Sequence, residues 1–154
     1  MNFAKRFLIS MLATMISCAV SAEEISRQQV SEFIAAMDRA IENRDADTLE
    51  AAIAENAQFT AHVTLGGQVQ KVQMGKGQYI DSVRNVWAQS TTYSYRRANE
   101  VITFSGRSAN VVSDVIEEIT VGGQTVRSTS HETATIELVN GKPLLTRVVG
   151  KAEM

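Results

Sequence analysis

The sequence is poor in the side chains that support redox and metal chemistry. Its 154 residues contain one cysteine, Cys18, and two histidines, His62 and His131, which fall on separate predicted strands. Because Cys18 lies in an N-terminal segment that we expect to be removed, the mature chain should have no disulfide and no thiol chemistry. Without further cysteines or a His-x-x-x-His spacing, we predict no metal site and no cofactor.

Sequence motifs for nucleotides and acyl groups are also missing. The Gly-Lys-Gly run at residues 75–77 is too short for a phosphate-binding loop, and no Gly-x-Ser-x-Gly elbow occurs. The chain has 15 Lys and Arg against 17 Asp and Glu. Because this acidic balance offers nothing to phosphate backbones, we expect no nucleic-acid partner. The sequence also lacks repeats, low-complexity tracts and linkers, which indicates a single domain over residues 23–154.

One long apolar run is present, and it stands at the N-terminus. Two basic residues precede the uncharged segment 7–20, and small residues and two glutamates follow it. This order is typical of a secretory signal peptide over residues 1–22, cleaved after Ala22. We therefore expect a periplasmic or secreted protein with no membrane attachment after cleavage. A lipoprotein attached through Cys18 is the alternative, because the residues before it loosely resemble a lipobox.

Helical periodicity marks the first part of the mature chain. Ser26 and Gln29 form a capping-box pattern, and apolar residues follow at helical spacing, which predicts a helix over about residues 25–44. Asp47 is expected to begin a second, shorter helix. A third helix is expected around residues 79–87, where apolar residues again recur at helical spacing.

A two-residue period marks the remaining segments. Residues 57–65 alternate apolar and polar side chains, and a Gly-Gly pair turns them back into a short partner strand. Four long strands follow, over residues 91–104, 108–121, 124–139 and 144–154. Helices segregated from consecutive hairpins predict an α+β fold, in which three helices cover one face of a curved, mainly antiparallel sheet that forms a cone. Gly150 falls inside a strand, where we expect a bulge or tight bend.

The segment IENRDADTLEAAIAENAQF, residues 41–59, combines a long helix, a polar break with Asp, a second helix and an amide residue before the first strand. Together with the element order, it resembles the nuclear transport factor 2-like (SnoaL-like) superfamily. The resemblance implies a deep pocket between helices and sheet, often a dimer, and little about function. Steroid isomerases of this fold carry a catalytic Asp and Tyr. Those positions fall on Ala61 (or on His62 after a one-residue slip) and Met37, which counts against that activity.

The stretch STSHETATIEL, residues 128–138, places a histidine and a carboxylate in a predicted strand. If Ala134 and Ile136 face the core, alternation turns Glu132 inward and His131 outward, so the two cannot form a dyad. A carboxylate that faces the core must be paired or must open into a cavity. Glu132 is therefore our candidate general base. In the alternatives, it lies near the open rim of the cone, or it pairs with an arginine. The candidate partners are Arg96, Arg97 and Arg147.

Asp114 is the second candidate carboxylate. Both tracks of its strand carry apolar residues, so its direction is open, and an inward Asp114 would complete a two-carboxylate pocket with Glu132. Tyr93 and Tyr95 share one side of their strand, where a ring with one hydroxyl suits either a pocket wall or ordinary sheet packing. The residues that we predict to line a ligand pocket are Phe33, Met37, Trp87, Tyr93 and Tyr95.

Three functions fit these patterns. The first is an exported domain that binds a small apolar molecule or serves in assembly, with no evident catalytic set. The second is a lyase, isomerase or hydrolase with Glu132 as general base and Tyr93 or Tyr95 stabilising an oxyanion. The third is an interaction module that forms a homodimer through the Thr-rich sheet face left uncovered by the helices. We favour the first, and therefore lean against an enzyme.

Overall fold

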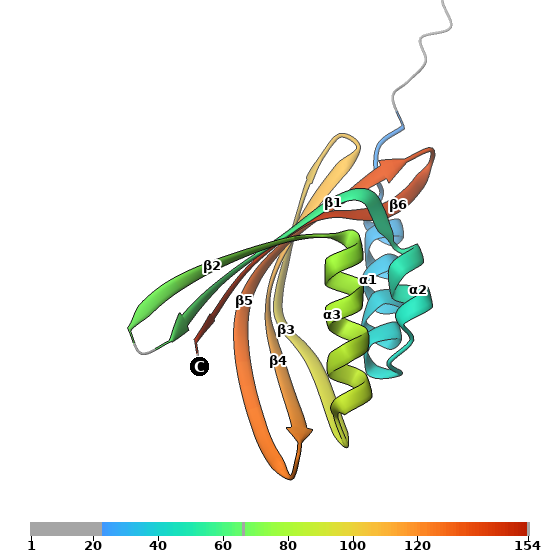
Figure 1. Ribbon diagram of the computed structural model, residues 1–154. Coiled ribbons are helices and arrows are strands. Elements are labelled where there is room, and N and C mark those ends of the chain that lie inside the picture. Colours follow the sequence, from blue (N-terminus) through green and yellow to red (C-terminus); the bar gives the residue numbers. More distant parts are fainter. Residues whose placement is uncertain (1–22, 66, 154) are drawn as a thin grey trace, which may run out of the picture.

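The computed structural model describes residues 23–65 and 67–153 (Figure 1). The predicted signal peptide and Cys18 lie outside the described residues. The helices are α1 (Arg27–Glu42), α2 (Ala46–Ala51) and α3 (Lys76–Gln89). The strands are β1 (Ile53–Leu65), β2 (Gln68–Gly75), β3 (Thr92–Ser105), β4 (Ser108–Val121), β5 (Gln124–Val139) and β6 (Lys142–Glu153). In the part of the chain that the structure describes, no helix is long and apolar enough to cross a membrane.

The strands form one curved sheet, and the helices lie on its concave side (Figure 1). The strand order is β2-β1-β6-β5-β4-β3, in which β1 and β6 run parallel and the other neighbours run antiparallel. The parallel pair joins the first hairpin to the four later strands. The predicted α+β fold, with three helices on a mainly antiparallel sheet, is therefore confirmed.

Helix α1 begins where its capping box predicts. Ser26 Oγ accepts a hydrogen bond from the Gln29 backbone N–H at 3.1 Å, and Gln29 Oε1 accepts one from the Ser26 N–H at 2.8 Å. Caps of this kind stabilise a helix by about 1 kcal/mol. The helix buries one apolar stripe, which consists of Val30, Ile34, Met37 and Ile41. This spacing turns the stripe toward the sheet.

Helix α2 begins one residue earlier than its acidic residues suggest. Its N-cap is Asp45, whose Oδ1 accepts a hydrogen bond from the Thr48 backbone N–H at 3.0 Å, so the predicted start at Asp47 is wrong by one residue. Arg84 of α3 then ties the two helices together. Its Nη2 lies 2.8 Å from a carboxylate oxygen of both Asp47 and Glu50.

A bulge in β3 changes which side chains face the helices. The pairing of β3 with β4 shifts between Ala98 and Val101, and Asn99 there has a positive φ of 54°. Because side chains alternate along a strand, the inserted residue reverses the parity. Tyr95 packs against the core before the bulge, and Ile102 packs against it after the bulge.

Gly150 does not form the predicted bulge. It pairs directly with Glu132 on β5 and with Ala61 on β1. The irregularity of β6 lies nearer its start, where the pairing with β5 skips Thr146. The prediction of a bulge at Gly150 is wrong, because the missing side chain leaves space on the concave face and does not interrupt the strand pairing.

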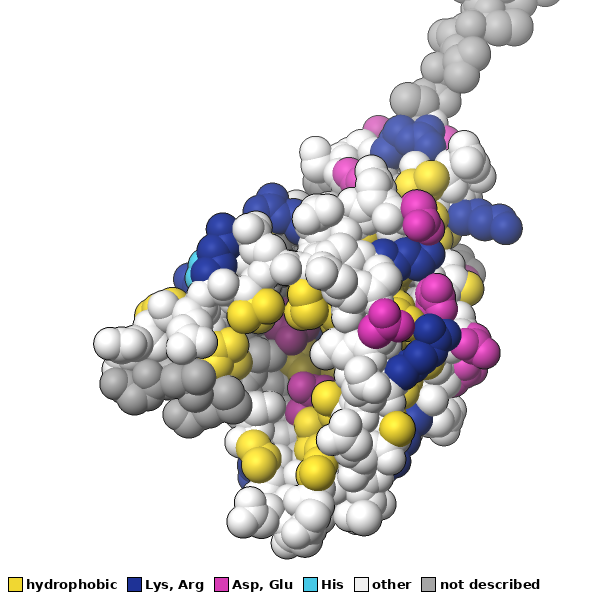
Figure 2. Space-filling view, viewed as in Figure 1, with side chains coloured by type: hydrophobic (Ala, Val, Ile, Leu, Met, Phe, Trp, Pro, Cys, Tyr) yellow, Lys and Arg dark blue, Asp and Glu magenta, His cyan; other side chains and the backbone are white. Residues whose placement is uncertain are grey.

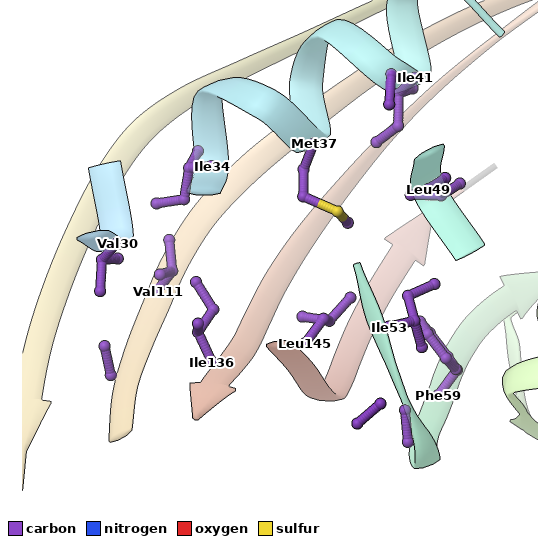
Figure 3. Close-up of a cluster of buried hydrophobic side chains, with 14 of the residues drawn as sticks. Val30, Ile34, Met37, Ile41, Leu49, Ile53, Phe59, Val111, Ile136 and Leu145 are labelled. Atoms are coloured by element: carbon purple, nitrogen blue, oxygen red, sulfur yellow. The ribbon is translucent and has the colours of Figure 1, made fainter. Parts of the chain in front are cut away.

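The hydrophobic core lies between α1, α2 and the sheet (Figure 3). Its central side chains are Val30, Ile34, Met37, Ile41, Leu49, Ile53, Phe59, Val111, Ile136 and Leu145. Each buried aliphatic side chain contributes about 1.5–3 kcal/mol. Toward α3 this packing opens into a cavity.

Candidate functional site

A cavity of about 290 Å³ lies between the helices and the concave face of the sheet. Figure 2 shows it as a hollow beside α3, in which hydrophobic side chains surround acidic ones. The exposed residues Ser82 and Val86 of α3 contribute to its lining near the surface. All five residues predicted to line a pocket do line this cavity: Phe33, Met37, Trp87, Tyr93 and Tyr95.

Aromatic side chains are concentrated at this cavity. Six of the seven aromatic residues in the described chain line it, and the seventh, Phe104, lies at the surface. Phe59 and Tyr79 stack with ring centroids 3.9 Å apart, and Trp87 meets Tyr93 edge-on at 6.0 Å. Aromatic pairs in these geometries hold their rings in defined orientations. The cavity wall is therefore largely built from rings.

Arg97 of β3 lines the cavity, and each of its three guanidinium nitrogens donates a hydrogen bond to a neighbouring side chain. Its Nη2 donates to Tyr95 Oη at 2.6 Å and to Asp38 Oδ1 at 3.1 Å, and its Nε donates to the same Asp38 oxygen at 3.2 Å. Its Nη1 donates to Ser113 Oγ at 2.8 Å. Tyr95 Oη in turn donates to Asp38 Oδ1 at 3.2 Å. The guanidinium is thus fixed in place and its charge is matched by Asp38 of α1.

Glu132 lines the same cavity from β5, with the orientation that alternation predicts. Its Oε1 accepts a hydrogen bond from Ser130 Oγ at 2.8 Å. Within the described residues it has no ion-pair partner, so the alternative in which it pairs with an arginine is not observed. Burial raises the pKa of the Glu132 carboxyl, against the Ser130 hydrogen bond and the charge of Arg97. A Cβ placed on Gly150 would lie 3.7 Å from Glu132 Cγ, so the absence of a side chain at Gly150 leaves space beside Glu132.

Glu117 of β4 supplies a second carboxylate to the cavity. Its Oε1 accepts a hydrogen bond from Tyr93 Oη at 2.6 Å. Tyr79 of α3 lies near both carboxylates. Burial raises the pKa of the Tyr79 hydroxyl, and the negative charges of Glu132 and Glu117 raise it further. Both acidic groups and this neutral phenol therefore face one space.

Asp114 does not face the cavity, and the prediction that it completes a pocket with Glu132 is wrong. Its Oδ1 lies 2.9 Å from His131 Nδ1 on the opposite face of the sheet, and Asn99 Nδ2 donates to its Oδ2 at 2.6 Å. The reason is the parity of β4, which turns the buried Ser113 inward and Asp114 outward. These hydrogen bonds, from Asn99 first and then from His131, lower the pKa of Asp114.

The outer face carries a larger and more open hollow, of about 890 Å³, that includes both histidines. His62, Arg127, His131 and Lys151 contribute to it together with Asp114. In the described ranges, 23–65 and 67–153, no three His, Cys, Asp or Glu residues are placed to hold a metal ion. The inner cavity is the better candidate site, because it is more enclosed and its lining is more apolar.

Three polar residues of the site were not proposed as site residues from the sequence. Arg97 shares the parity of Tyr95, so alternation along β3 could have found it. Glu117 lies on a strand with apolar residues on both tracks, which left its direction open. Asp38 falls among the polar side chains of α1 and carries no sequence signal, because its role depends on Arg97, 59 positions away.

The described geometry can be compared with known proteins. Neither a known family model nor a curated protein sequence matches the chain. Solved structures match it in fold. An NTF2-like protein from Cytophaga hutchinsonii ATCC 33406 has a TM-score of 0.66 and 14% identity, covering 83% of this chain and 99% of that one. The hexachlorocyclohexane dehydrochlorinase LinA-type3 from Novosphingobium barchaimii LL02 has a TM-score of 0.64 and 19% identity, covering 82% of this chain and 85% of that one.

Identities this low show a shared fold and leave the activity open. The likeness covers most of both chains. On this basis, the chain has the fold of the nuclear transport factor 2-like superfamily.

Proposed function

We propose that this chain is a ligand-binding domain whose cavity holds a small, largely apolar organic molecule. The observation that carries the proposal is an apolar, ring-lined cavity of about 290 Å³ around a few fixed polar groups. Ligand pockets have this composition, and this volume is at the lower end of their usual range. Tyr95 and Arg97 hold each other in place, so their orientation is set before a ligand arrives. Such preorganisation lowers the entropic cost of binding.

Trp87 offers a direct test, because it is the single tryptophan of the chain and lines the cavity. We expect its fluorescence to change with at least one of four one-ring probes: toluene, benzyl alcohol, benzylamine and benzoate. Ala134→Phe should fill the cavity and abolish the change. Val101→Phe is the control, because Val101 is 59% exposed and does not line the cavity. A response to none of the probes, or an equal response in Ala134→Phe, contradicts the proposal.

Catalysis is the second candidate function, and Glu132 is the observation that favours it. A carboxyl with a raised pKa lines the same cavity as the fixed donors Tyr95 and Arg97. A general base beside preorganised donors could remove a proton and stabilise the resulting oxyanion. Glu132→Gln should then lower kcat/KM about 100-fold or more for any substrate found, while Trp87 still reports binding. Unchanged turnover in Glu132→Gln would exclude this role.

We also propose that the chain is exported, with its signal peptide cleaved after Ala22, and that it forms a homodimer through the outer face of the sheet. The basis of the first proposal is the N-terminal sequence pattern, and that of the second is the sheet face opposite the three helices. Native mass spectrometry of the chain recovered from the periplasm reports both properties. A mass that includes residues 1–22 contradicts the first proposal, and a monomer contradicts the second.

A further inference from the structure

We infer that the ligand of this cavity is a small organic cation, such as a protonated amine on an aromatic or aliphatic body. The inference rests on the proposed ligand-binding function and narrows it to one chemical class. It is carried by three features of the cavity: its balance of charges, its aromatic wall, and the Tyr79 hydroxyl, which has no hydrogen bond to a described residue.

The charges of the cavity do not balance. Among the described residues that line it, Arg97 is the one cationic side chain, and Asp38 neutralises it at 3.1 Å. Glu117 and Glu132 receive hydrogen bonds from neutral hydroxyl groups, at 2.6 Å and 2.8 Å. A hydroxyl donor solvates a carboxylate without cancelling its charge. The described lining of the cavity therefore has two carboxylates and no cationic side chain left to pair with them.

The wall of the cavity suits a positive charge. Six aromatic rings line it, and ring faces attract cations, most strongly where water is excluded. Tyr79 adds an independent sign of a ligand. Its ring is stacked on Phe59, and its hydroxyl lies near Glu117 and Glu132 without a hydrogen bond to any described residue. The ammonium group of a bound cation fits the space that this hydroxyl and the two carboxylates share, because its N–H groups can donate to their oxygen atoms.

Other ligand charges fit less well. An anion would face two carboxylates, and the nitrogens of Arg97 are already donating to Asp38, Tyr95 and Ser113. A neutral ligand would displace water from both carboxylates without compensating them. A cation replaces this water and also supplies the positive charge that the two carboxylates lack.

The same geometry predicts how binding depends on pH. The groups that face Glu132 are Tyr95 and Arg97 of β3, Glu117 of β4 and Tyr79 of α3, with Asp38 of α1 behind Arg97. None of them supplies an unmatched positive charge. A bound cation favours the ionised form of Glu132, so its affinity should rise with pH until the ligand amine itself loses its proton.

Three probes of one size separate the ligand classes: benzylamine, benzyl alcohol and benzoate. Their dissociation constants are measured by Trp87 fluorescence and isothermal titration calorimetry near pH 8. We expect benzylamine to bind about tenfold more tightly than benzyl alcohol, and benzoate most weakly. If benzyl alcohol or benzoate binds as tightly as benzylamine, this inference is wrong and the proposed function remains. If none of the three binds and toluene also fails, both are wrong.

Matched variants locate the effect. Glu132→Gln and Glu117→Gln should each lower the preference for benzylamine over benzyl alcohol about tenfold and leave benzyl alcohol binding unchanged. Glu118→Gln is the control, since Glu118 neighbours Glu117 but is exposed on the outer face. A preference that survives in both inner variants, or that also falls in Glu118→Gln, overturns the inference.

Discussion

Glu132 and His131 are neighbours on β5 but lie on opposite faces of the sheet, and the carboxyl groups on the two faces have opposite pKa shifts. Glu132 faces the cavity, where burial raises the pKa of its carboxyl. His131 faces outward and lies 2.9 Å from Asp114, whose pKa is lowered by hydrogen bonds from Asn99 and His131. One sheet thus holds two carboxyls whose pKa values shift in opposite directions. The difference teaches that the side of the sheet, and not the residue type, decides which acid is suited to bind or react.

The largest expected effect comes from breaking the inner network. Arg97→Ala leaves the half-buried Asp38 and the buried Ser113 without their partner, so the free energy of unfolding should fall by about 3 kcal/mol. Arg96→Ala, one residue away on the exposed side of β3, should change it by less than about 0.5 kcal/mol. Urea denaturation measures both variants. Equal losses would mean that the two faces do not differ as described.

Glu132→Gln should have a smaller effect, with a characteristic pH dependence. Because the pKa of Glu132 is raised in the folded state, the folded chain holds a proton that the unfolded chain releases. Stability therefore falls as pH rises from the ordinary carboxyl range through the raised pKa. The variant should lack this fall and exceed the parent by about 1 kcal/mol at neutral to alkaline pH. Urea denaturation curves across this range measure it, and parallel pH profiles for parent and variant would contradict the prediction.

Asp114→Asn should show the opposite sign on the outer face. The pKa of Asp114 is lowered by its hydrogen bonds, first from Asn99 and then from His131. Its contribution is present at neutral pH and is lost as pH falls through the lowered pKa. The variant should therefore flatten the acid limb of the stability profile alone. Solvent and salt screen this side chain, so the change should be smaller than that of Glu132→Gln and should shrink in high salt. An unaltered acid limb would count against the Asp114 contacts.

The smallest effect is expected from Gly150→Ala. The new Cβ would lie 3.7 Å from Glu132 Cγ, an ordinary contact distance, and glycine costs a strand about 0.5–1 kcal/mol relative to alanine. We therefore expect a gain of about 0.5 kcal/mol in thermal or urea denaturation. A clear loss of stability would show that the wall beside Glu132 is tighter than described.

Local patterns predicted much of this molecule. The capping box at Ser26 and the alternation around Glu132 depend on neighbouring residues. The structure confirms both the cap and the inward orientation of Glu132. Alternation failed for Asp114 because both tracks of β4 carry apolar residues, so local sequence held no information on which track faces the helices. The pairing of Asp38 with Arg97 was not foreseen for another reason. It joins α1 to β3, and its partners are fixed by packing and not by spacing.

The most direct test of the site is a titration of the Glu132 carboxyl by carbon-13 NMR, assigned by its loss in Glu132→Gln. The ordinary pKa of a glutamate carboxyl is 4.5, and burial in the cavity predicts a midpoint clearly above it, which benzylamine should then lower. A midpoint at or below 4.5 in the chain without ligand would contradict a buried, uncompensated carboxyl at this position.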